Sequence, residues 1–185
     1  MKAGGGFART TTRGQVSHVR NMLMNSYHFR LFARFVASEL IPVSFRARLM
    51  QLIGFTLPKT ALVWPGANFR STKVMIGEGA FINVGFYHDG CGDLYIGNNV
   101  SIGPYVRIIT GTHETGPSRR RCSTDVSKPV RIEDGCWIGA GVTILPGVTV
   151  ESGCVVAAGA VVVASTEADG LYSGVPARRA RHLSS

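Results

Sequence analysis

The sequence predicts a mainly β fold in which short strands wind into a parallel β-helix, and a six-residue periodicity is the main evidence. From residue 132 to residue 163 an aliphatic residue returns at every sixth position, with a glycine three positions after most of them. The aliphatic residues in this phase are Ile132, Ile138, Ile144, Val150, Val156 and Val162, with Ile76, Ile82, Ile96, Ile102 and Ile108 upstream. Helices repeat at 3.6 residues and simple strands at 2, so a strict period of six predicts a short strand, a tight corner and another short strand.

Three such units form one coil of a three-sided prism. The aliphatic residue of each unit points into the prism and stacks on its equivalent in the next coil. Glycine or asparagine occupies the corners, where a positive φ is favourable. One coil cannot bury its apolar face alone, so the stacking of neighbouring coils stabilises the fold.

The chain divides into four parts on this basis. Residues 1–14 are expected to be a flexible tail, residues 15–58 a helical N-terminal segment, residues 59–177 the β-helix, and residues 178–185 a basic C-terminal tail. One long loop insertion, residues 113–129, interrupts the β-helix. A length of 185 residues allows one main domain with a small appendage.

Composition narrows the class of protein. The four cysteines show no metal-ligand spacing, and Cys136 and Cys154 fall at inward repeat positions, which predicts small buried thiols in a reducing cytosol. The first residues contain no apolar run before a cleavage site, and no run of about 18 apolar residues exists. We therefore expect a cytoplasmic protein, located at the membrane face if the N-terminal segment binds lipid.

The N-terminal segment is basic and amphipathic. Residues 1–58 contain eight basic residues and one acid, Glu39, within a chain of formal net charge +9. Apolar residues recur at helical spacing over residues 15–41, Pro42 ends that pattern, and a second short helix is expected to end near Gly54. We favour helices that pack on the end of the β-helix. Peripheral contact with an anionic membrane remains the alternative, and scattered basic residues without a binding motif argue against nucleic acid.

The candidate site lies where the six-residue phase breaks. The next repeat position after Ile108 would be residue 114, but the repeat resumes only at Ile132, so about 18 residues are inserted, and His113 opens this insertion. A long excursion from a regular prism must loop outward, and such loops usually carry function. This position favours a functional histidine over an ordinary surface one.

Four motifs resemble a known family. They are similar to the hexapeptide-repeat O-acetyltransferases of maltose, galactosides and nodulation factors, and to the related O-antigen and capsule acetyltransferases. The four motifs are Phe81–Asn83 (FIN), IGNNVSIGPYVRIITGTH, KPVRIEDGCWIGAGVTILPGVTV and Ser173–Arg178 (SGVPAR). The resemblance covers roughly residues 60–181. It implies a left-handed β-helix, acetyl-CoA as cosubstrate, and transfer of an acetyl group to a saccharide hydroxyl. Outward apolar residues such as Trp137 and Val155 on the flat prism faces predict a homotrimer with sites between subunits.

The resemblance also implies roles for individual residues. His113 is the expected general base, because a neutral imidazole suits that task near pH 7. Asn83 is expected to hydrogen-bond the acceptor, unless it is only a corner asparagine. Candidates for the acid that orients the imidazole are Asp125, Glu114 and Asp89; candidates for contact with coenzyme A are Trp137, Gly139, Ala140, Ala158, Arg178 and Arg181.

Three arginines in the insertion, Arg119, Arg120 and Arg121, suggest an anionic saccharide acceptor, such as a polysaccharide or lipid-linked precursor, because guanidinium groups bind phosphate and carboxylate. A solvated basic loop is the alternative. No metal is expected, because the five histidines lack the three-ligand arrangement of a zinc site. An antibiotic or amino-sugar N-acetyltransferase and a non-catalytic scaffold remain open as other functions.

Overall fold

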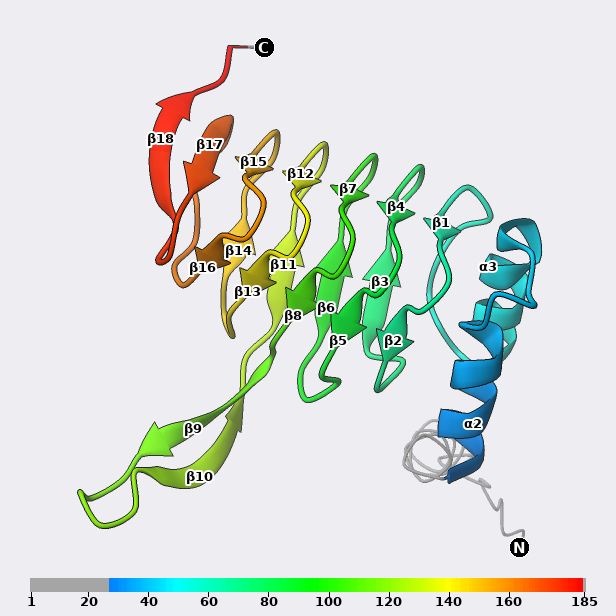
Figure 1. Ribbon diagram of the computed structural model, residues 1–185, viewed down its shortest axis with the longest axis horizontal. Helices are drawn as coiled ribbons and strands as arrows, with labels where there is room; N and C mark the ends of the chain where they lie inside the picture. The colour runs from blue at the N-terminus through cyan, green and yellow to red at the C-terminus, as the bar shows by residue number, and fades with distance from the viewer. Residues whose placement is uncertain (1–26, 185) are drawn as a thin grey trace, which may run out of the picture.

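The computed structural model describes residues 27–184 and shows a left-handed parallel β-helix with two helices at its N-terminal end (Figure 1). Successive coils contribute strands to three sheets, here called sheets A, B and C, in which neighbouring strands pair parallel except for one antiparallel pair at the end of sheet B. Sheet A contains β3 (Val74–Ile76), β6 (Leu94–Ile96), β11 (Val130–Ile132) and β14 (Thr149–Val150). Sheet B contains β1 (Leu62–Val63), β4 (Phe81–Ile82), β7 (Ser101–Ile102), β12 (Trp137–Ile138), β15 (Val155–Val156), β17 (Gly170–Ser173) and β18 (Arg178–His182). Sheet C contains β2 (Asn68–Phe69), β5 (Tyr87–His88), β8 (Arg107–Ile108), β13 (Thr143–Ile144) and β16 (Val161–Val162).

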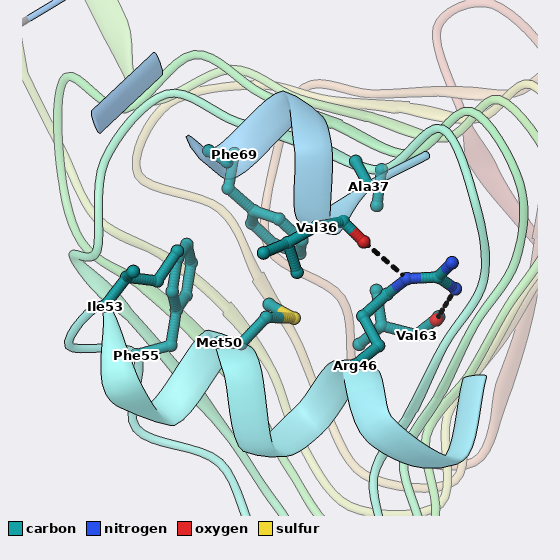
Figure 2. Close-up of a pocket in the computed structure, with 10 residues that line it drawn as sticks. Val36, Ala37, Arg46, Met50, Ile53, Phe55, Val63 and Phe69 are labelled. Carbon is teal, nitrogen blue, oxygen red and sulfur yellow. Dashed lines mark hydrogen bonds between the residues drawn. The ribbon is translucent and has the colours of Figure 1, made fainter. Parts of the chain in front are cut away.

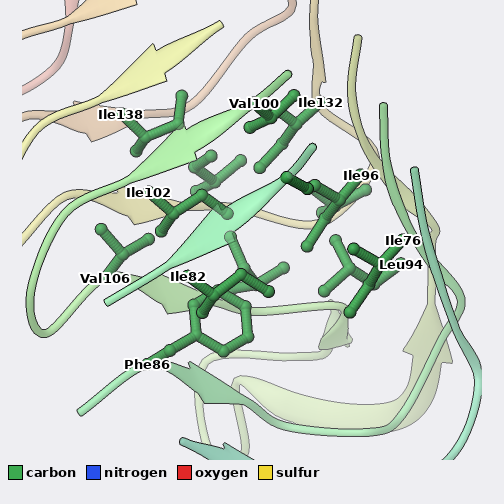
Figure 3. Close-up of a cluster of buried hydrophobic side chains, with 14 of the residues drawn as sticks. Ile76, Ile82, Phe86, Leu94, Ile96, Val100, Ile102, Val106, Ile132 and Ile138 are labelled. Atoms are coloured by element: carbon green, nitrogen blue, oxygen red, sulfur yellow. The ribbon is translucent and has the colours of Figure 1, made fainter. Parts of the chain in front are cut away.

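The core is the interior of the prism, as the periodicity predicts. Stacked aliphatic side chains fill it, and most of them have no exposed surface at all (Figure 3). Cys136 and Cys154 lie among them as free buried thiols, which confirms their predicted positions. Burial raises the pKa of Cys136 to about 12, so this thiol stays protonated and unreactive at neutral pH.

The corners need backbone that turns sharply. Gly135, Gly141, Gly153 and Gly159 have φ angles of 69° to 72°, and Asn99 has 53°. A side chain is disfavoured in this left-handed region, which explains why glycine marks the repeat.

The two helices pack on the N-terminal end of the β-helix, as favoured above. They are α2 (Tyr27–Val36) and α3 (Val43–Leu52). Helix α2 ends at Val36 instead of continuing to residue 41, while residues 15–26 of the expected helix lie outside the described range. Pro42 is the N-cap of α3 and not the end of α2.

A buried arginine explains the early end of α2. Arg46 is 1% exposed and donates to the carbonyl oxygens of Val36, at 2.8 Å, and Val63, at 2.7 Å (Figure 2). It also donates to the carbonyls of Ser38 and Ile41. The guanidinium therefore joins the end of α2, the α2–α3 connection and the first coil of the β-helix.

The C-terminal end of the β-helix differs from the prediction. Residues 178–182, expected in a basic tail, form β18, which runs antiparallel to β17. Ala177 is buried before it, and Arg179 pairs with Glu167. The strand covers the edge that β17 would otherwise leave open. Over residues 27–184, no helix is long and apolar enough to cross a membrane.

Candidate active site

The insertion that carries His113 is a β-hairpin and not an irregular loop. Its strands, β9 (Gly111–Thr115) and β10 (Cys122–Ser127), pair antiparallel and place His113 directly opposite Asp125. His113 Nδ1 lies 2.9 Å from Asp125 Oδ1, and the two side chains are 48% and 92% exposed. This contact favours the tautomer with a proton on Nδ1, which leaves the Nε2 lone pair free to accept a proton.

Asp89 holds the base of this hairpin instead of contacting His113. Its carboxylate accepts hydrogen bonds from the backbone N–H groups of Thr110 (2.9 Å), Gly111 (2.8 Å) and Cys91 (3.3 Å), and from the Thr110 hydroxyl. Burial alone would raise the pKa of Asp89, but the bonds from Thr110 and Gly111 outweigh it and lower the pKa below its usual value.

Glu114 is next to His113 in β9, so their side chains point to opposite faces of the hairpin. Among the three acids predicted as orienting partners, only Asp125 contacts the imidazole within residues 27–184.

The corner between sheets B and C gathers a second group of predicted residues. Equivalent residues of successive coils stack here in one column, and the backbone N–H of each donates to a carbonyl of the next coil at 2.8 to 3.0 Å. The column consists of Trp64, Asn83, Gly103, Gly139 and Ala157. Asn83 is half-buried there, and its Oδ1 accepts from the Val84 N–H. The edge beside it carries the small residues Gly139, Ala140 and Ala158.

Close stacking explains the small residues on this edge. A Cβ on Gly139 would lie 2.6 Å from the Ala158 nitrogen, and one on Gly103 would lie 2.8 Å from the Ala140 nitrogen. No side chain fits at either position. The structure thus brings Asn83, Gly139, Ala140 and Ala158 together along one edge of the prism.

Trp137 lies next to this edge on the outer face of sheet B and is 60% exposed. The paired positions along this face are Leu62, Phe81, Ser101, Trp137, Val155, Leu171 and Arg181. Arg181 therefore ends the row that contains Trp137. Arg178 is exposed in the same strand and donates to the Ala177 carbonyl.

The histidine and the edge with Asn83 are separated within one chain. The hairpin leaves the prism between β8 and β11, at the corner of sheets C and A, and extends away from the body (Figure 1). Asn83 follows β4, at the corner of sheets B and C. One chain alone does not bring His113 to Asn83.

The hairpin tip carries the three predicted arginines. The Gly116 N–H donates to the Arg121 carbonyl, and the Arg120 N–H donates to the Pro117 carbonyl, which closes the turn. All three arginines are exposed. The pair Gly116 and Arg121 lies three residues along the strands from His113, roughly 10 Å at the usual rise of a strand. The arginines are therefore at the tip and not directly beside the histidine.

His88 is inside the prism, in the column that contains Ile108 and Ile144 on sheet C. It is fully buried, both ring nitrogens lack a hydrogen-bond partner, and burial lowers its pKa. Residues 27–184 contain no group of three or more His, Cys, Asp or Glu side chains placed to hold a metal ion.

Thr110 is the site residue that sequence reasoning missed. Its hydroxyl binds Asp89 and accepts from the Gly92 N–H at 2.8 Å, and its carbonyl accepts from the Lys128 N–H at 2.8 Å. It thereby joins the two ends of the excursion. The available signal was its position, because Thr110 is a polar residue directly where the six-residue phase breaks.

Stacked six-residue coils define the class of hexapeptide-repeat proteins. A family model of the bacterial transferase hexapeptide, covering six repeats, matches residues 129–164.

Comparison with known proteins identifies the family. A putative acetyltransferase of Staphylococcus haemolyticus is 34% identical over 138 residues, which cover 75% of this chain and 72% of that protein. The galactoside O-acetyltransferase of Lactococcus lactis is 39% identical over 80 residues, 43% of this chain but only 39% of that enzyme. A crystal structure of a hexapeptide-repeat acetyltransferase of Vibrio cholerae, complexed with acetyl-CoA, superposes with a TM-score of 0.76 at 27% identity over 98% of this chain and 95% of that one. The chain belongs to the hexapeptide-repeat acetyltransferase family.

Proposed function

We propose that this protein is an acetyl-CoA-dependent O-acetyltransferase that acts on a saccharide hydroxyl. The observation that carries the proposal is the His113–Asp125 pair, at 2.9 Å, on the one excursion from the β-helix. The names of the relatives support it, because one is a galactoside O-acetyltransferase and another was solved with acetyl-CoA.

The pair fits a general-base mechanism. Asp125 holds the imidazole through Nδ1, so Nε2 takes the proton as the acceptor oxygen attacks the carbonyl carbon of the thioester. The tetrahedral intermediate then collapses with cleavage of the carbon–sulfur bond, and Nε2 returns the proton to the coenzyme A thiolate. A saccharide hydroxyl is a very weak acid and is not ionised at neutral pH. Its attack on the thioester therefore depends on such a base.

Asn83 is the proposed positioning group for the acceptor. Its Oδ1 is occupied by the Val84 N–H, which directs the Nδ2 donors away from that backbone group. An oriented Nδ2–H can donate to an acceptor oxygen and hold it for attack.

Coenzyme A is proposed to bind along the corner of sheets B and C. The row of Gly139, Ala140 and Ala158 leaves space for a thin pantetheine arm, and exposed Trp137 offers an aromatic face beside it. Arg181, at the end of the Trp137 row, and Arg178 are the proposed contacts of the nucleotide phosphates.

A homotrimer is proposed because the site is incomplete in one chain. The outer face of sheet B exposes Leu62, Trp64 and Trp137 at 44%, 43% and 60%, and such apolar faces usually meet a partner surface. A neighbouring copy can place its hairpin against the edge with Asn83. Each site would then combine His113 of one copy with Asn83 of another.

The basic groups point to the nature of the acceptor. The exposed arginines at the hairpin tip suit an anionic saccharide, such as a polysaccharide or lipid-linked precursor. Exposed Phe32, Phe35 and Phe45 on the helices suit peripheral contact with a membrane, where such a precursor would be found.

The decisive experiment is an acetyl-transfer assay over a panel of sugars, lipid-linked saccharides and amines, with His113→Ala as the test variant. We expect transfer to a hydroxyl in the wild type and a fall in kcat of at least about 10²-fold in the variant, because a positioned base supplies about 10²–10⁴-fold. Thr115→Ala, an exposed change in the same strand, is the matched control and should keep activity. In the acceptor panel, transfer only to amines would establish N-acetylation, and no transfer at all would favour a non-catalytic scaffold. If the activity of His113→Ala stays within tenfold of wild type, His113 is not the general base.

A further inference from the structure

An open groove of about 720 Å³ lies between α2 and the outer face of sheet C at the N-terminal end of the β-helix. Helix α2 forms one wall with Leu31 and Arg34. Sheet C forms the other with the outward side chains of Asn68 and Tyr87, and Arg70 closes the end. The volume is within the usual range for small-molecule sites, roughly 300–1,000 Å³.

The groove adjoins the edge that carries Asn83. Gly66, in its wall, lies directly under Gly85, whose N–H donates to the Pro65 carbonyl. Trp64 is the residue under Asn83 in the same corner column. The groove thus begins one coil below Gly85, which is two residues along the chain from Asn83, and it extends across sheet C to Arg70, six residues beyond Trp64.

The charge of the groove is one-sided. Both Arg34 and Arg70 are exposed and have no ion-pair or side-chain hydrogen-bond partner in the described part of the chain. No aspartate or glutamate is among the described residues that line the groove. Other arginines of the β-helix are engaged: Arg131 pairs with Glu133, and Arg107 donates to Thr143.

The remaining lining suits a sugar. Tyr87 is half-buried and presents part of a ring, and Asn68 offers both a donor and an acceptor. Guanidinium groups select planar anions such as carboxylate and phosphate, which a neutral sugar does not contain.

We propose that this groove is an acceptor subsite, in which Arg34 and Arg70 bind an acidic group of an extended saccharide whose reacting hydroxyl lies beyond the groove, at Asn83. The proposal rests on the proposed function and deepens it, because it assigns a defined groove to the carboxylate or phosphate group of the acceptor. It places recognition of this charge on the β-helix and α2 of the chain that supplies Asn83, separate from the hairpin arginines.

The test is a binding titration that needs no acetyl transfer. Methyl β-D-glucuronide and methyl β-D-glucoside differ only in the carboxylate at C6, and galactose 1-phosphate supplies the phosphate case. We expect the full-length protein to bind the glucuronide at least about fivefold more tightly than the glucoside in NMR titrations. Arg34→Gln together with Arg70→Gln should remove this preference.

A control separates the groove from other basic surfaces. Arg48→Gln, an exposed change in α3 outside the groove, should keep the preference. Unchanged melting temperatures exclude unfolding as the cause. Equal binding of the two glycosides, absence of binding of all three probes, or a preference that survives the double substitution would overturn the acceptor subsite. None of these results bears on the His113-dependent transfer, whose failure appears only in the activity assay.

Discussion

Arg46 provides a direct test of how the helices are attached to the β-helix. Replacing it with methionine keeps much of the side-chain volume but removes four hydrogen bonds to backbone carbonyls, of Val36, Ser38, Ile41 and Val63. The bonds to Val36 and Val63 are buried, so water cannot easily replace the lost donor. The Ser38 carbonyl keeps a second partner, the Ile41 N–H.

The expected loss of unfolding free energy follows from the two buried carbonyls. Each unsatisfied buried acceptor costs about 1–3 kcal/mol, which gives about 2–6 kcal/mol for two. The variant also no longer buries a guanidinium, a group whose pKa is lowered by burial, and this offsets part of the cost. We therefore expect a loss of about 3 kcal/mol, and a fall in Tm of roughly 6–12 °C at about 2–4 °C per kcal/mol.

The assay combines denaturant unfolding with amide hydrogen exchange. Exchange should accelerate most at the Gly66 N–H, which donates to the Ala37 carbonyl, while β12 and β13 keep their protection. Arg48→Met, two residues away on the exposed side of α3, is the control and should change stability by less than about 0.5 kcal/mol. If Arg46→Met is as stable as Arg48→Met, the carbonyl bonds do not hold the helices in place.

The remaining predictions concern the site, the assembly and pH. Asp125→Asn should lower kcat about 10-fold or more with little change in the KM for acetyl-CoA, because it weakens the orientation of His113; equal kcat in steady-state assays would contradict this. Trp137→Glu should convert a trimer to smaller species in light-scattering measurements, and a monomeric wild type at micromolar concentration would already refute the trimer. Serine at residues 119–121 should raise the KM for an anionic acceptor and leave the KM for acetyl-CoA unchanged; a rise only in the latter would assign these arginines to the cofactor. Burial lowers the pKa of His88 in the folded protein, so just below pH 6.5 only the unfolded chain takes up a proton, and stability should fall as the pH drops below 6.5. His88→Leu should flatten this pH dependence of the melting temperature between pH 8 and pH 5. An unchanged slope would show that His88 is not the cause.

The six-residue period predicts the strands and the core because it is a direct consequence of the coil geometry. Every sixth aliphatic residue from Ile132 to Val162 is buried, with an exposed fraction of at most 1%. The same geometry places Gly139, Ala140 and Asn83 on one edge, since residues in the same phase stack.

Two features were not predictable in this way. The hairpin strands bury almost no side chains, so they leave no apolar pattern in the sequence. The end of α2 depends on a guanidinium ten residues away from the carbonyl of Val36, and a buried arginine without a carboxylate partner contradicts the usual expectation that charges stay at the surface.

The way in which Thr110 joins the two ends of the hairpin has an evolutionary consequence. The Lys128 N–H donates to the Thr110 carbonyl, and β11 pairs with β6 in register, so the coils continue as if the intervening residues were absent. Substitutions or insertions in the hairpin turn, residues 116–121, can therefore accumulate without altering the buried columns. The hairpin tip can diverge in sequence while the scaffold stays under strict constraint, because changes at the tip do not reach the stacked core.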